Sequence, residues 1–146
     1  MKRLHALLLL VALLGSAALA AVPARAATLR AVLITASTEP GETDPRLATY
    51  EVTLKRVFRF QSYTYQGSDT AELQPGRPAE LLIGQGHEMT VEPGDNPLAL
   101  RIRWTDAGRA LMTTGVTLRP GVPALLGGPR TGNAPGEVYA VILVAR

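Results

Sequence analysis

The sequence contains no cysteine, and beyond residue 26 it contains one histidine and three serines. Without thiols the chain forms no disulfide, and one histidine cannot supply a tetrahedral zinc site without several carboxylates. The serines, Ser37, Ser62 and Ser68, lie in no nucleophile motif. We expect His87, beside a Gly-Gln-Gly turn, to be exposed and idle. The sequence therefore predicts no catalytic residue, no metal ligand and no cofactor, and thus a protein that is not an enzyme.

Long hydrophobic runs are absent except at the N-terminus, where residues 1–26 have the pattern of a secretory signal peptide. Residues 1–3 form a positive n-region, residues 4–14 an apolar h-region, and residues 18–20 and 24–26 are two Ala-x-Ala cleavage sites. We expect cleavage at the second site, because a strand-like sequence follows it directly. An uncleaved membrane anchor is the alternative, but the h-region is shorter than the roughly 20 apolar residues that span a bilayer. The pattern predicts export without a membrane span after cleavage, with a periplasmic location favoured over an extracellular one.

An excess of positive charge is also absent once residues 1–26 are removed. The whole chain has 15 Lys and Arg against 12 Asp and Glu, and three of the basic residues precede the cleavage site, which leaves 12 of each sign. A nucleic-acid-binding protein would be expected to show a basic face, and the sequence has no cluster of Lys and Arg. The sequence therefore predicts no nucleic-acid partner.

Residues 27–146 have the length of a single domain that can bury a core without disulfides. Residues 28–36 and 138–145 are apolar on both faces, a pattern typical of central strands, which could lie side by side. Residues 98–105 alternate between apolar and polar side chains, which predicts a strand with one face on the core. The residues expected in the core are Leu33, Leu98, Leu100, Ile102, Trp104 and Ile142.

The remaining segments predict hairpins and one helix. Asp44 and Pro45 have the residue types of a helix N-cap and first position, and an apolar stripe follows over residues 45–57. A strand starting at Tyr50 is the alternative for this segment. Hairpins are expected to join 79–83 with 87–92 and 109–118 with 122–126, after an extended segment 59–65 and a turn at 67–69. The fold class predicted is α+β and β-dominated, an antiparallel sandwich or rolled sheet of seven or eight strands with one N-terminal amphipathic helix (45–57).

Two short motifs resemble ion or phosphate sites only in outline. Glu39, Glu42 and Asp44 gather three carboxylates, and calcium takes oxygen ligands, but the alternating spacing of a calcium loop is missing. Glycines at the two ends of 127–132 match the ends of a phosphate loop, but the Lys and Ser or Thr that should follow are absent. We expect a solvated acidic loop and an ordinary glycine-rich loop.

Five of the seven aromatic residues lie between residues 50 and 65, with two arginines among them. Such residues are usually the large members of a small core, and an exposed set could instead bind a glycan or a peptide by stacking. We expect Tyr63 and Tyr65 to be the most exposed of them. The candidate ligand-binding residues are therefore Tyr63, Tyr65, Arg56 and Arg59.

The last 35 residues of the chain carry a resemblance. Residues 113–128, Thr-Thr-Gly-Val-Thr-Leu-Arg-Pro-Gly-Val-Pro-Ala-Leu-Leu-Gly-Gly, and the late apolar strand 138–145 are similar to the hairpin in the β-domain of bacterial secretins. The family's Pro-x-Leu-Gly lip segment and the strands needed for a pore are missing. Residues 54–65 also resemble small exported proteins of environmental Gram-negative bacteria. The first resemblance implies a place beside a secretin- or pilus-type assembly, and neither implies a catalytic residue.

These observations favour a non-catalytic binding or structural module of the cell envelope. Its expected partner is an envelope protein that adds a strand at 79–83 or 87–92, since β-rich modules commonly bind in this way. A secreted glycan- or ligand-binding domain is the first alternative and a small hydrolase the second.

Overall fold

The computed structural model describes residues 27–146, so the predicted signal peptide lies outside the described residues. Strands dominate, with one short helical segment near the N-terminus, and this confirms the predicted fold class. The elements are β1 (Ala27–Ser37), η1 (Pro45–Tyr50), α1 (Glu51–Val57), β2 (Ser62–Leu73), β3 (Ala79–Gly84), β4 (His87–Pro93), β5 (Ala99–Asp106), β6 (Arg109–Thr117), β7 (Ala124–Arg130) and β8 (Val138–Ala145).

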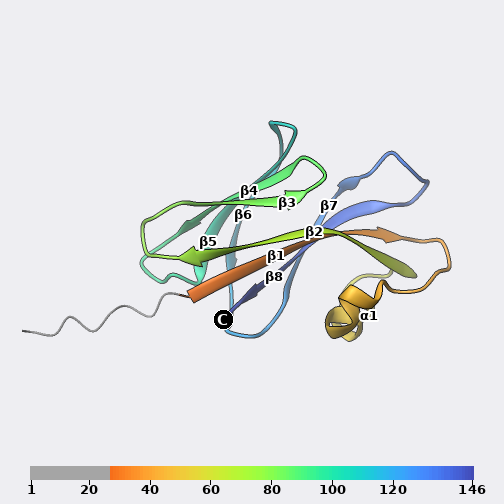
Figure 1. The fold of residues 1–146 in the computed structure, drawn as a ribbon, viewed down its shortest axis with the longest axis horizontal. Coiled ribbons are helices and arrows are strands. Elements are labelled where there is room, and N and C mark those ends of the chain that lie inside the picture. Colours follow the sequence, from red (N-terminus) through yellow and green to blue (C-terminus); the bar gives the residue numbers. More distant parts are fainter. Residues whose placement is uncertain (1–26) are drawn as a thin grey trace, which may run out of the picture.

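The strands form two four-stranded antiparallel sheets (Figure 1). The first sheet has the order β2-β1-β8-β7, and the second has the order β3-β4-β5-β6. β1 and β8 are adjacent at the centre of the first sheet, with Leu33 opposite Val141. Their interior position was predicted from two apolar faces, and each strand here contributes one face to each of two apolar layers.

The main apolar layer lies between the two sheets. From β5 it receives Leu100, Ile102 and Trp104, all buried, while Leu98 is partly buried against the same cluster. Alternate residues of β1 and β8, such as Leu33 and Val141, complete it from the opposite side. The predicted inward face of the 98–105 segment is therefore confirmed, as is the burial of Leu33 and Ile142.

A second apolar layer covers one end of the outer face of the first sheet, where the helical segment packs (Figure 1). Leu47 and Leu54 are buried there against residues of β1 and β8 such as Ile34 and Ile142. The segment begins as predicted, because the carboxylate of Asp44 accepts a hydrogen bond from the backbone N–H of Arg46 at 3.0 Å. Among residues 27–146, no helix has the length and apolarity needed to cross a membrane.

One predicted turn is wrong, because β2 continues through residues 67–69. Gly67 lies so close to β3 that a Cβ atom at this position would overlap the carbonyl oxygen of Ile83. The pairing of β2 with β1 shifts its register opposite Leu33 and Ile34, as it does at a β-bulge. Glycine is therefore required here for a close approach between strands, which local sequence cannot distinguish from a turn.

The predicted hairpin between 109–118 and 122–126 is also wrong. Within residues 27–146, β6 pairs only with β5 in the second sheet, and β7 pairs only with β8 in the first sheet. The connection through Arg119-Pro120-Gly121 therefore carries the chain from one sheet to the other. The hairpin of β3 and β4 was predicted correctly.

Candidate functional site

The predicted ligand residue Tyr63 belongs to the core, so the expectation of an exposed side chain is wrong. It lies beneath the helical segment, and its hydroxyl donates to the carbonyl oxygens of Leu54 at 3.1 Å and Phe58 at 3.2 Å. Burial raises the pKa of the Tyr63 phenol. The residue therefore holds the end of α1 onto β2 and is not accessible to a ligand.

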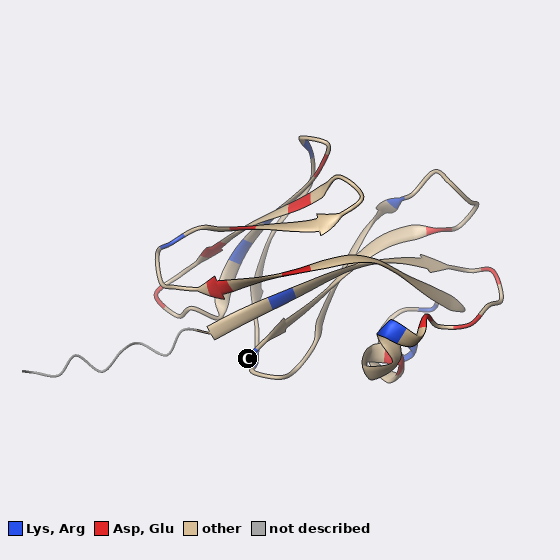
Figure 2. Ribbon diagram, viewed as in Figure 1, with Lys and Arg blue, Asp and Glu red and all other residues tan. Residues whose placement is uncertain are grey.

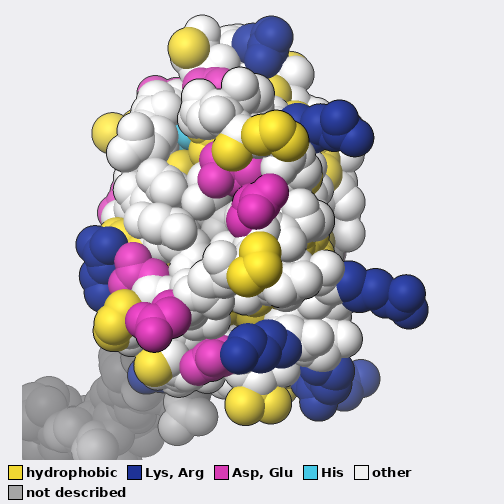
Figure 3. All heavy atoms as spheres, turned by 90° about the vertical axis from the view of Figure 1, so that its right-hand side faces the viewer, with side chains coloured by type: hydrophobic (Ala, Val, Ile, Leu, Met, Phe, Trp, Pro, Cys, Tyr) yellow, Lys and Arg dark blue, Asp and Glu magenta, His cyan; other side chains and the backbone are white. Residues whose placement is uncertain are grey.

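The other three predicted ligand residues do not form one surface with Tyr63. Tyr65 is partly buried, its hydroxyl lies 2.8 Å from that of Ser68, and the Arg46 guanidinium covers its ring at 4.4 Å. Arg56 and Arg59 are exposed near the end of α1. The face of the molecule that carries α1 shows basic, acidic and hydrophobic side chains side by side (Figure 3). The predicted aromatic and basic ligand site is therefore not assembled.

Asp44 caps the start of the helical segment. Its carboxylate accepts from the Arg46 guanidinium at 2.8 Å, in addition to the backbone N–H of Arg46. These hydrogen bonds hold the pKa of Asp44 well below its usual range. No cluster of three or more His, Cys, Asp or Glu side chains arranged to hold a metal ion occurs within residues 27–146.

His87 is buried, which corrects the expectation of an exposed histidine. The indole Nε1 of Trp104 donates to His87 Nδ1 at 3.0 Å, and the ring of Tyr139 lies 4.4 Å from the imidazole. Burial lowers the pKa of His87, and the nearby Asp106 carboxylate, 3.9 Å from Nε2, only partly offsets this effect. The histidine is a neutral acceptor for a buried tryptophan.

The three serine hydroxyls have partners other than His87. Ser37 accepts from the backbone N–H of Glu39, Ser62 donates to the carbonyl oxygen of Glu39, and Ser68 is bonded to Tyr65. The arrangement therefore joins no serine to the buried histidine.

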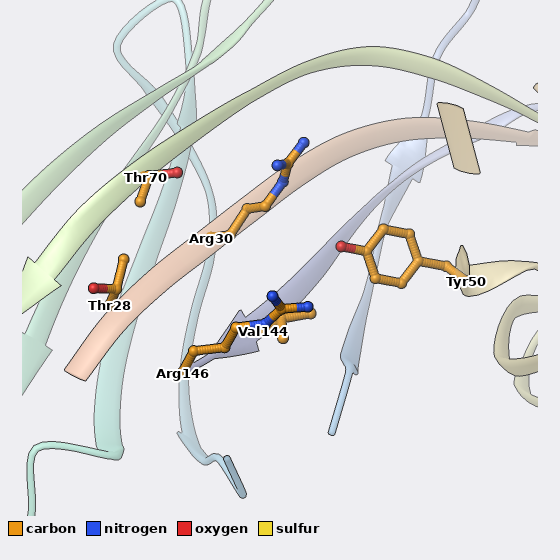
Figure 4. A pocket seen from close by; sticks show the side chains of 6 residues that line it. All are labelled: Thr28, Arg30, Tyr50, Thr70, Val144 and Arg146. Carbon is orange, nitrogen blue, oxygen red and sulfur yellow. The ribbon is translucent and has the colours of Figure 1, made fainter. Parts of the chain in front are cut away.

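The first feature suited to binding is a hollow of about 400 Å³ on the outer face of the first sheet (Figure 4). It begins where the helical segment stops covering the sheet, and Figure 4 shows the hydroxyl of Tyr50 directed over the exposed strands. Arg30 from β1 and Arg146, just after β8, are both exposed there. The hollow is lined by Thr28, Arg30, Tyr50, Thr70, Val144 and Arg146.

The second feature is the free edge of β6. This nine-residue strand has the sequence Arg-Ala-Leu-Met-Thr-Thr-Gly-Val-Thr, with no charge after Arg109 and no proline. In the part of the chain that the structure describes, β5 is its single partner. Next to the paired strands, the N–H of Leu118, just after β6, donates to the carbonyl oxygen of Leu98, just before β5. The alternation of the antiparallel ladder therefore turns the N–H groups of Thr113, Gly115 and Thr117 away from β5.

β2 and β3 shield each other's free edges, and the loop that contains Asp44 covers part of the β2 edge. The Asp69 carboxylate on β2 accepts from the backbone N–H of Leu82 on β3 at 2.9 Å. The N–H of Asp44 donates to the carbonyl oxygen of Tyr63 at 2.9 Å, and its carboxylate accepts from the N–H of Tyr65. The predicted edge at 79–83 is therefore shielded by β2, and the predicted edge at 87–92 is an interior strand, β4.

The fourth edge, β7, carries two features that natural proteins use to prevent pairing. Its register is broken by an irregularity between Gly127 and Arg130, and Pro129 has no N–H to donate. Charged residues are spread over both sheets and the loops and are not gathered in one patch (Figure 2). Within residues 27–146, β6 is therefore the sheet edge best suited to accept another strand.

Sequence reasoning missed both features. The hollow arises from residues far apart in the chain, and no local pattern indicates it. The β6 edge had a signal, the uncharged and proline-free run 110–118, but the predicted hairpin assigned it a partner strand.

Comparisons of the chain with protein-family models, with curated proteins and with solved structures gave no match.

Proposed function

We propose that this chain is a non-catalytic binding module of the cell envelope, and that it binds a partner by strand addition to β6. The observation that carries the proposal is the open β6 edge beside three edges that are covered or interrupted. A long, uncharged edge strand is a template for pairing with another chain unless charges, proline or bulges protect it. The sequence pattern favoured strand addition at β3 or β4, and this proposal places the added strand at β6 instead.

The side chains of β6 suit an added strand on both faces. Thr113, Gly115 and Thr117 are exposed on the solvent side, and Met112 and Val116 are partly buried against the core. An extended segment beside β6 would gain main-chain hydrogen bonds over about 30 Å at about 3.3 Å per residue. It would also cover the remaining exposed apolar surface of Met112 and Val116. The preferred partner segment is therefore extended, with an apolar residue at every second position.

The envelope context of this proposal comes from the sequence. Residues 1–26 have the pattern of a signal peptide, and the segment similar to the secretin β-domain covers most of β6 together with β7 and β8. We therefore place the partner among the proteins of a secretin- or pilus-type assembly. This placement concerns the identity of the partner, whereas the β6 edge concerns the mode of binding.

Site-specific photo-crosslinking in cells tests the mode of binding. A photoreactive residue at Thr117 lies on the β6 edge, and one at Thr90 lies on the same face of the second sheet but on the interior strand β4. We expect Thr117 to give a discrete adduct with an envelope protein and Thr90 to give none. Equal adducts from both positions would indicate face-on contact and contradict strand addition.

A secreted ligand-binding domain is the second candidate function, and one observation favours it. The hollow of about 400 Å³ next to Arg30 and Arg146 falls within the size range of small-molecule sites. The tyrosine-based version of this candidate has lost its support, because Tyr63 is buried. The hollow and the β6 edge belong to different sheets, so the two binding functions are compatible.

A further inference from the structure

The hollow on the first sheet places two positive charges next to each other. Thr28 and Arg146 exchange backbone hydrogen bonds of 2.8 and 2.9 Å, and Arg30 is opposite Val144 in the same strand pairing. Arg30 and Arg146 are therefore diagonal neighbours on one face of the sheet, within reach of each other's long side chains. Figure 4 shows both side chains at the border of the hollow. Like charges in this relation repel each other unless an anion lies between them.

No ion pair joins either arginine to a carboxylate in the part of the chain that the structure describes. The ion pairs there join Arg46 with Asp44 and Lys55 with Glu51. The nearest acidic residue by strand register is Glu72 on β2, which is opposite Thr28 and thus diagonal to Arg30, and no ion pair joins it to Arg30. The two guanidinium groups are therefore available to a ligand.

Neutral hydrogen-bonding groups complete the lining. Thr28 lies beside Arg30 on β1, Thr70 lies opposite Arg30 on β2, and Tyr50 from the end of η1 lines the hollow from the helical segment. Val144 supplies an apolar floor. Two guanidinium groups, hydroxyl donors and a small apolar surface are the combination that orients a polar small molecule with an acidic group.

We infer that this hollow binds an oxyanion, a carboxylate or a phosphate group, carried on a molecule about the size of a monosaccharide. Arginine recognises both groups with paired N–H donors, so the shared chemistry is the planar or tetrahedral set of anionic oxygens. The volume of about 400 Å³ leaves room for one sugar-sized unit beside the anionic group. This inference is independent of strand addition, because none of the lining residues belongs to β6.

Calorimetric or NMR titration at low ionic strength tests the inference and distinguishes the two sources of the anion. Inorganic phosphate probes the phosphate arm, glucuronate probes the carboxylate arm, and neutral glucose controls for the sugar ring. We expect saturable binding of phosphate, of glucuronate or of both, with no binding of glucose, and weakening at high salt. No saturable binding of either anion up to about 10 mM, where even a weak site would fill, would overturn the inference.

Substitutions identify the residues responsible. Arg30→Gln and Arg146→Gln should each weaken anion binding about tenfold or more, because each removes a charge-assisted hydrogen-bonding group. Glu72→Gln should strengthen binding, since it removes the negative charge diagonal to Arg30. Arg109→Gln is the matched control, because Arg109 is an exposed strand arginine on the second sheet that does not line the hollow.

The control makes the outcome decisive. Arg30, Arg146 and Arg109 are all exposed, so the substitutions should leave the urea-unfolding midpoint unchanged. Binding that Arg109→Gln weakens as much as Arg30→Gln would show attraction by net charge alone and would overturn the site. Loss of anion binding in Arg30→Gln with an unchanged β6 crosslink would separate the hollow from the partner-binding edge.

Discussion

The Nε1 atom of Trp104 donates a hydrogen bond of 3.0 Å to the Nδ1 atom of His87 between the two sheets. Both side chains are buried, and the acceptor role of Nδ1 requires that the imidazole is neutral. Protonation of His87 would remove the acceptor and place a charge in the core beside Trp104. The stability of the domain therefore depends on the protonation of one histidine.

The sign of this pH dependence follows from the lowered pKa of His87 in the folded state. The unfolded chain, with a histidine pKa near 6.5, binds a proton more readily than the folded chain. The free energy of unfolding should thus be highest above pH 6.5 and should decrease as the pH falls toward the folded-state pKa. Urea unfolding at about pH 7.5 and 5.5 measures this difference in the free energy of unfolding.

The variant His87→Asn keeps a hydrogen-bond acceptor but does not titrate. It should therefore flatten the dependence of the free energy of unfolding on pH, and an unchanged slope would contradict the assignment.

Burial of His87 could have been found in the sequence. His87, Met89 and Val91 alternate with Glu88, Thr90 and Glu92, so His87 is in phase with the inward face of β4. The turn beside it suggested exposure, but the period-2 pattern was the stronger signal. The partner Trp104 comes from β5, where Met89 is opposite Trp104 and His87 is opposite Asp106, and this register is not visible locally.

Tyr63→Phe should lower the free energy of unfolding by about 1 kcal/mol, because it removes the hydroxyl that donates to the carbonyl oxygens of Leu54 and Phe58. Chemical denaturation measures the change. Tyr65→Phe is the comparison, since its hydroxyl bonds only to the Ser68 side chain in a partly buried position, and we expect a smaller effect. A larger loss for Tyr65→Phe would contradict the core assignment of Tyr63.

Gly67→Ala should destabilise the domain by about 1–3 kcal/mol, the usual range for overpacking. The added Cβ atom would overlap the Ile83 carbonyl oxygen where β2 meets β3, so the strands must separate. Gly115→Ala is the matched control, because a Cβ atom there would meet its nearest neighbour, the Leu100 carbonyl oxygen, at 3.9 Å. Thermal or urea unfolding of both variants should differ clearly, and equal stability would show that the approach of β2 to β3 is not tight.

The protein recovered from the periplasm should begin at Ala27, since cleavage at the second Ala-x-Ala site precedes β1 directly. Mass spectrometry of the intact protein decides between this site and the first one, which would give an N-terminus at Ala21. An intact Met1 in the membrane fraction would contradict export with cleavage.

Local sequence patterns correctly predicted the elements that their own residues are sufficient to indicate. The two apolar faces of 28–36 and 138–145 indicated central strands, and Asp44 with Pro45 indicated the start of the helical segment. The close approach at Gly67 and the switch of sheets after β6 depend on distant strands, so Gly-Ser-Asp and Arg-Pro-Gly were both interpreted as ordinary turns. The ligand site was predicted incorrectly for the same reason, because the packing of α1 over β2 buries Tyr63.

The most direct test of binding at β6 compares Thr113→Pro with Thr113→Ala in cells that carry the photoreactive residue at Thr117. Proline removes an N–H that points away from β5, so it blocks an added strand while the β5–β6 ladder is kept, and alanine keeps that N–H. We predict that the proline variant loses the adduct, that the alanine variant retains it, and that both variants stay folded. An adduct of equal yield in the two folded variants would contradict strand addition at this edge.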